Sequence, residues 1–128
     1  MNPELLKYAQ ENLDKMPPEV QQKVGELIAE ARKLTTRELA HTDFMAFVNY
    51  VWPNFIHGRH HQRMARAFER VARGECKRLI INMAPRHSKS EMASYLLPAW
   101  FLGKFPQKKI IQASYNAELA VGFGRKVR

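Results

Sequence analysis

Lys89 and Ser90 stand side by side within RLIINMAPRHSKSE, residues 78–91, and together they could hold a nucleotide. In a phosphate-binding loop a lysine ammonium contacts the β- and γ-phosphates, while the hydroxyl that follows it contacts Mg²⁺. The usual loop reads GxxxxGK[ST] and lies between a buried strand and a helix. Aligned on Lys89 and Ser90, that pattern puts Met83 and Ser88 at its glycine positions. The sequence therefore has the phosphate-binding side chains of such a loop without its glycines.

The chain around the loop has the order of elements that phosphate binding requires. Residues 79–83, LIINM, form a short apolar run rich in β-branched residues, which is typical of a strand buried in a parallel sheet. A turn with proline follows, and SKSEMASYLLPAWFL has a helical composition. Ser88 is small enough to replace glycine, and Arg86 supplies a fixed positive charge where phosphoryl transfer needs one. The alternative interpretation is a basic surface turn.

These elements predict an α/β fold in which N-terminal helices precede the start of a P-loop NTPase parallel sheet. We expect residues 79–83 and 109–114 to form parallel strands, joined by a right-handed connection. The helix of that connection should start between Ser88 and Ser90. Pro98 should kink or divide this helix, because proline removes a backbone donor.

A row of arginines precedes the loop, on the helix expected within residues 56–75. Its members recur at steps of four, three, four and three, which places them on one narrow face; they are Arg59, Arg63, Arg66, Arg70 and Arg73. This arginine stripe could contact phosphates of nucleic acid or a neighbouring subunit, or it could be the solvated face of an amphipathic helix. The neighbouring His57, His60 and His61 do not predict zinc, because no cysteine or acidic cluster completes a tetrahedral set.

Composition and charge predict a globular protein with a polyanionic partner. The 128 residues are 45% hydrophobic, with a formal net charge of +9 and a single cysteine. Residues 1–34 hold five Lys or Arg against six Asp or Glu, whereas residues 35–128 hold sixteen against six. The positive charge therefore belongs to the second part. No apolar run of about 18 residues and no signal pattern is present, so we expect a soluble, intracellular protein without a membrane partner.

Patterning divides the chain into three segments. Residues 1–34 should be an N-terminal helical segment, residues 35–77 a helical lead-in with the basic helix, and residues 78–128 a partial P-loop ATPase core. Asn2 can cap a first helix that has Pro3 in its first turn, and a second helix should run from Pro18 to about Leu34. Its predicted apolar stripe consists of Val20, Val24, Leu27, Ile28 and Ala31. A further helix, FMAFVNYVW, is expected to supply core residues.

From Phe44 to Arg128 the chain resembles the start of the ATPase domain of the tailed-bacteriophage terminase large subunit, the motor that packages viral DNA. The resemblance is carried by HGRHHQRM and by RLIINMAPRHSKSEMASYLLPAWFLGKFPQKKIIQASYNAELAVGFGRKVR, in which the family has a PPRHGKSE-type deviant Walker A loop. It implies that ATP and Mg²⁺ are cofactors and that Ser90 contacts the metal of the bound nucleotide. Arg86 would act in catalysis on the γ-phosphate. The residues that would bind the nucleotide are Lys89, Ser90, Ser88, His87 and, at the adenine, Gln62.

The resemblance also implies partners and a cellular setting. They are double-stranded viral DNA, the terminase small subunit and the portal protein, within a ring oligomer in the cytoplasm of the bacterial host. The family continues with an acidic Walker B motif and a nuclease domain, but here only Glu91 and Glu118 follow Ser90. We therefore expect a phage or prophage terminase fragment whose sheet is truncated before the Walker B strand, and which is inactive as a hydrolase alone. The alternative is a non-catalytic basic helical module that binds nucleic acid.

Overall fold

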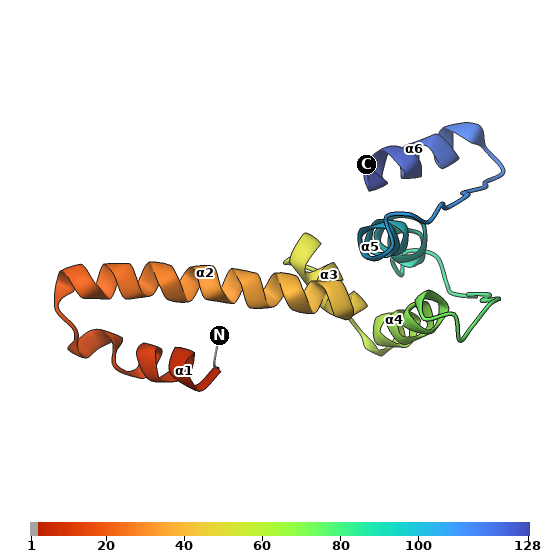
Figure 1. The fold of residues 1–128 in the computed structure, drawn as a ribbon. Coiled ribbons are helices and arrows are strands. Elements are labelled where there is room, and N and C mark those ends of the chain that lie inside the picture. The colour runs from red at the N-terminus through yellow and green to blue at the C-terminus, as the bar shows by residue number, and fades with distance from the viewer. Residues whose placement is uncertain (1–2) are drawn as a thin grey trace. The chain divides into compact units, whose positions relative to one another are not determined.

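The computed structural model describes residues 3–128, and every regular element in that range is a helix (Figure 1). The chain divides into two compact units, Met1–Leu39 and Ala40–Arg128. None of the described helices is both long and apolar enough to cross a membrane. The helices are α1 (Pro3–Glu11), η1 (Leu13–Lys15), α2 (Pro18–Thr42), α3 (Phe44–Val51), α4 (Arg59–Ala72), the π-helical η2 (Glu91–Leu96), α5 (Leu97–Lys104) and α6 (Ala117–Val127).

In the first unit the chain turns back between α1 and α2 (Figure 1). The predicted cap, Asn2, lies outside the described residues. Of the predicted apolar stripe on α2, Ile28 and Ala31 are buried, whereas Val20 and Leu27 are exposed. The stripe therefore packs only along part of its length.

The end predicted for the second helix, near Leu34, was wrong, because α2 continues to Thr42. The hydroxyls of Thr35 and Thr36 donate to the carbonyls of Ala31 and Arg32, four residues earlier, at 3.0 and 2.8 Å. Threonine can satisfy its hydroxyl within a helix in this way, so it need not cap a new one. The change in charge along the sequence consequently does not coincide with a break in the backbone.

The second unit is built around an aromatic core that joins α3, α4 and α5. The Phe44 ring lies edge-on to the rings of Phe68 and Trp100, with centroids 5.3 and 5.4 Å apart. The Trp100 indole Nε1–H donates to the Ala40 carbonyl at 3.0 Å, so its polar atom is satisfied inside the core. Asp43 caps α3 by accepting from the Ala46 N–H. Phe44 and Val48 of FMAFVNYVW are buried in this core, as predicted, whereas Val51 and Trp52 of the same segment are exposed.

The helix after the loop begins at Lys89, passes through the π-helical η2 and continues as α5. Pro98 follows η2 almost directly and has no N–H with which to reach the Ser94 carbonyl in the α-helical pattern. That carbonyl instead accepts a hydrogen bond from the Gln112 side chain. The irregularity predicted at Pro98 is present as a π-helical turn, a common site of bending in helices.

The predicted α/β fold was wrong, because no strand occurs among residues 3–128. Residues 79–83 and 109–114, expected as parallel strands, have no regular secondary structure. Ile80 is 85% exposed and Ile111 is 95% exposed, whereas buried strands would cover both. The first segment does bury one side, since Ile81 and Met83 pack against the aromatic core.

The physical reason for this error lies in what a strand needs. A short apolar run favours an extended backbone, but a strand forms only where a neighbouring segment pairs with its N–H and C=O groups. Periodicity carries no information on whether such a neighbour exists. The predicted right-handed strand connection is wrong for the same reason.

Replacing Phe68 by alanine tests the aromatic core. Phe68 is 1% exposed, so we expect Phe68→Ala to lower the free energy of unfolding by about 3–5 kcal/mol. Denaturant titration followed by tryptophan fluorescence measures this change, because both tryptophans, Trp52 and Trp100, lie in the second unit. The control is Tyr115→Ala, at a side chain that is 94% exposed, with an expected change below about 0.5 kcal/mol. Equal losses in the two variants would contradict this description of the core.

Candidate functional site

The loop before Lys89 has an unusual backbone. Arg86 and Ser88 have φ values of 63° and 54°, and they are the non-glycine residues with positive φ in the described chain. Positive φ thus alternates along the loop, with His87 between the two. Alternation of this kind turns successive N–H groups toward one concave side, which is how backbone nests bind anions. Ser88 has this conformation at the position where the usual phosphate-binding pattern has glycine.

A helix follows the loop without any intervening residue. Lys89 is its first residue, and the Ser88 carbonyl accepts the Met92 N–H at 2.9 Å. The first N–H groups of a helix have no acceptors within the helix, and its dipole makes this end attractive to anions. Loop and helix together border an open hollow of about 340 Å³, lined by Ala84, Pro85, Arg86, Ser88, Lys89, Ser90 and Glu91.

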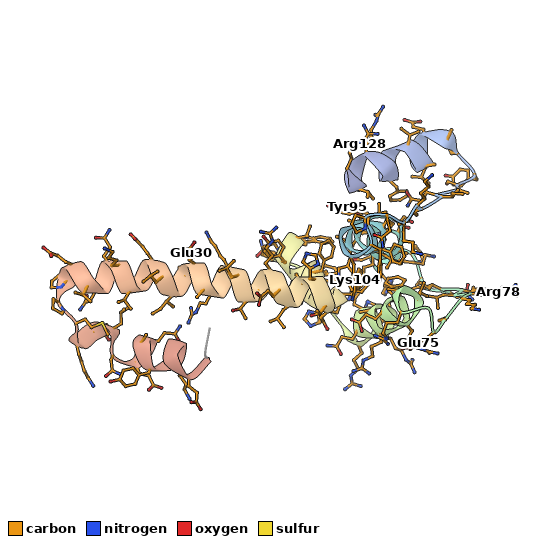
Figure 2. The ribbon with its side chains drawn as sticks, in the orientation of Figure 1. Glu30, Glu75, Arg78, Tyr95, Lys104 and Arg128 are labelled. Atoms are coloured by element: carbon orange, nitrogen blue, oxygen red, sulfur yellow. The ribbon has the colours of Figure 1, made fainter. Side chains whose placement is uncertain are left out.

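The charges around this hollow are predominantly positive. Arg86 is exposed. The Lys89 ammonium folds back and donates to the Met83 carbonyl at 3.4 Å, which is a weak bond for it to exchange for a phosphate oxygen. The Glu91 carboxylate is held by Lys126 of α6 at 3.0 Å, so part of its negative charge is neutralised. Next to this pair, Tyr95 of η2 lies on the side toward α6 (Figure 2).

The structure brings together four of the predicted nucleotide-site residues, and two others lie elsewhere. Arg86, Ser88, Lys89 and Ser90 share the hollow. Gln62 is on α4 and lines two different hollows, so its role at an adenine stays a prediction. His87 belongs to the loop but does not line this hollow: its Nδ1–H donates to the Pro85 carbonyl at 2.8 Å.

The arginine stripe runs along α4 to its C-cap, Arg73, and divides into two halves with different partners. In the C-terminal half, Arg70 pairs with Glu75 at 3.7 Å, and Arg73 pairs with Glu75 and Glu69 at 2.7 and 3.9 Å. Glu75 lies in the turn after α4 (Figure 2), and its hydrogen bond with Arg73 lowers the pKa of its carboxyl. In the N-terminal half an open hollow of about 630 Å³ is lined by Arg59, His60, Gln62, Arg63 and Arg66. The N-terminal half thus combines arginines with a concave surface.

Sequence reasoning missed a contact between the start of α4 and the loop. The rings of His60 and His61 have centroids 3.8 Å apart, and His60 meets His87 of the loop at 5.5 Å. Among the described residues, no group of three or more His, Cys, Asp or Glu is arranged to hold a metal ion. Nothing in the sequence signalled this contact, because it joins residues of two different elements.

Comparison with known proteins finds no match to the chain, whether among family models, curated proteins or solved structures. The resemblance to terminase therefore depends on the residues quoted above. The roles that it implies for Lys89, Ser90 and Arg86 stay predictions.

Replacing Ser88 by glycine tests the loop conformation. The left-handed conformation is unfavourable for serine, so we expect Ser88→Gly to raise the free energy of unfolding by about 0.5–1 kcal/mol. The matched control is Ser90→Gly, two residues later, where φ is −69° and the residue is helical. That change should lower the free energy of unfolding by about 0.5 kcal/mol. Denaturant titration measures both variants, and a loss of stability in Ser88→Gly would show that the loop has another conformation in solution.

Proposed function

We propose that the chain is the N-terminal part of a phage or prophage terminase large subunit, and that residues 84–90 bind the phosphates of Mg-ATP. The observation that carries this proposal is the loop itself, in which positive φ at Arg86 and Ser88 leads directly into a helix that starts at Lys89. Phosphate binding uses inward N–H groups, a helix N-terminus, an ammonium and a hydroxyl. Residues that could supply these groups line the same hollow, which supports the proposal.

Each residue of the loop has a distinct task in this proposal. Lys89 would exchange its bond to the Met83 carbonyl for the β- and γ-phosphates, and the Ser90 hydroxyl would contact the Mg²⁺ that accompanies them. Arg86, exposed and permanently charged, would meet the γ-phosphate. Bound Mg²⁺ supplies charge neutralisation, whereas the chain supplies orientation through backbone groups held by the turn.

The helical fold changes the setting of the loop but not these tasks. In P-loop proteins a sheet anchors the chain before the loop. Here Ile81 and Met83 anchor that chain by packing against the aromatic core, and Lys89 starts a helix whose Met92 and Leu96 are buried in the same core. The loop is therefore held on both sides. Double-stranded DNA, a terminase small subunit, a portal protein and a ring of subunits in the host cytoplasm belong to the same proposal.

Nucleotide binding by the purified chain tests this function. We expect a fluorescent ATP analogue with Mg²⁺ to bind the wild-type chain and to lose at least about tenfold in affinity in Lys89→Ala, because a charge-assisted phosphate contact contributes roughly 1.5–3 kcal/mol. The matched control is Lys108→Ala, at an exposed lysine outside the hollow, which should bind like the wild type. Equal affinities in all three proteins, or no binding by the wild type, would refute the proposal.

A second candidate function is a nucleic-acid-binding module that uses the N-terminal half of the arginine stripe. The observation in its favour is that Arg70 and Arg73 are paired with carboxylates, whereas Arg59, Arg63 and Arg66 line an open hollow. Arginines on a concave, exposed face suit the phosphates of a nucleic-acid backbone. This function does not need the loop, so the two candidates can be separated by mutation.

Salt-dependent DNA binding tests the second candidate. Replacing Arg59, Arg63 and Arg66 together by alanine should weaken binding and reduce the log–log salt slope by about 0.9 for each phosphate that the protein no longer neutralises. A matched double variant, Arg70→Ala with Arg73→Ala, should change the slope less, because these arginines already have carboxylate partners. Fluorescence anisotropy with a labelled duplex measures both. An unchanged slope in the triple variant would identify this half of the stripe as a solvated face.

A further inference from the structure

Aromatic rings form a continuous row from the end of α3 to the loop. Trp52 meets Phe55 at 4.8 Å between centroids, Phe55 meets His61 at 4.8 Å, and His61 meets His60 at 3.8 Å. The row ends where His60 lies edge-on to His87 of the loop, at 5.5 Å. The loop therefore contacts α4 through the rings of His87 and His60. His61, which packs against His60, is buried, with 5% of its surface exposed.

The hydrogen bonds of this pair define which ring nitrogen carries the hydrogen. The Gly58 N–H donates to His61 Nδ1 at 2.9 Å, so Nδ1 is an acceptor and the hydrogen of neutral His61 is on Nε2. His61 Nε2 lies 3.0 Å from His60 Nε2, and its N–H is shared between that nitrogen and the His87 backbone carbonyl, the other partner of this ring. His60 then carries its hydrogen on Nδ1. Both bonds exist together only when both rings are neutral.

Protonation of either ring replaces one of these bonds by two facing donors. A charged His60 would turn an Nε2–H toward the Nε2–H of His61, and a charged His61 would turn an Nδ1–H toward the Gly58 N–H. Burial and the charge of His60 lower the pKa of His61, while a hydrogen bond to the His87 backbone raises it by less. His57 and His87 also lower it, and Arg59, Arg63 and Arg66 line the same hollow as His60. A proton on this cluster therefore meets mostly positive or potentially positive neighbours.

We propose that His60 and His61 are positioning residues that form a proton-sensitive latch, holding the phosphate loop against α4 through His87 when both rings are neutral. The sign follows from the lowered pKa of His61. A histidine that is neutral in the folded state stabilises that state above its ordinary pKa of about 6.5, and this contribution is lost as the pH falls below that value. Acid thus opens the latch, and neutral pH closes it. Its effect on nucleotide rests on the proposed function, whereas the latch itself does not.

Nuclear magnetic resonance of the full chain at decreasing pH tests the latch directly. From pH 7.5 to pH 5.0, the protection of the Gly58 amide against hydrogen exchange should fall at least about fivefold, the loss of one net hydrogen bond. The contact between the His60 and His87 rings should disappear with the same midpoint. Circular dichroism should stay constant, since the change is local. Constant Gly58 protection, separate midpoints, or global unfolding with this midpoint would each overturn the proposal.

Two variants should change the pH dependence of Gly58 protection in different ways, and a third is the control. In His60→Gln the repulsive ring is gone, so the midpoint of the Gly58 transition should move to higher pH. In His61→Asn the side-chain carbonyl can still accept from Gly58 but cannot titrate, so Gly58 protection should become independent of pH. His41→Gln, at an exposed histidine of α2, should behave like the wild type. An unchanged midpoint in His60→Gln or an unchanged transition in His61→Asn would overturn the latch.

Nucleotide affinity measured in the same pH series separates this inference from the proposed function. If the ATP analogue binds in a Lys89-dependent manner, its affinity should fall with the Gly58 midpoint in the wild type, and at higher pH in His60→Gln. If affinity stays constant while the latch opens, the latch does not position the phosphate loop for binding, and that part of the proposal fails. If no nucleotide binds at any pH, the proposed function fails, and the Gly58 and ring-contact measurements still decide whether the latch exists.

Discussion

The packing of Phe44 is the interaction on which the second unit depends. Its fully buried ring touches Phe68 of α4 and Trp100 of α5. The backbone N–H of Phe44 donates to the Glu69 carboxylate at 3.1 Å. One residue thereby joins α3 to α4 and to α5, which comes much later in the sequence. The start of α4, which carries the histidines, and the helix that starts at Lys89 are both positioned by this contact. The geometry of the candidate site consequently depends on the aromatic core as well as on the loop.

Local patterns predicted helices well and failed wherever pairing between distant segments was needed. The spacing of the arginine stripe agreed with α4, and Pro98 predicted an irregular helix, because both effects act within a few residues. Residues 79–83 and 109–114 have strand-like composition, yet a strand depends on a partner that composition cannot specify. The helix break near Leu34 failed for a related reason, since threonine hydroxyls can bond back to their own helix.

The candidate site was partly predictable for the same reason. The grouping of Arg86, Ser88, Lys89 and Ser90 follows from their nearness in sequence, and the loop needs only to turn. The positive φ of Ser88 could be anticipated from the glycine that the usual pattern has at that position. The contact between His60 and His87 could not, because it joins residues from different elements. Likewise, the division of the arginine stripe depends on Glu75, which lies outside the repeating pattern.

The bond between Gln112 and the Ser94 carbonyl limits how the length of this chain can vary. Pro98 leaves that carbonyl without its α-helical donor, and the replacement comes from a residue eighteen positions further along. An insertion or deletion between the two would move the amide away from its acceptor, even in the exposed turn after Lys104, where loops normally tolerate such changes. The number of residues between Ser94 and Gln112 is therefore constrained, whichever residues occupy the positions between them.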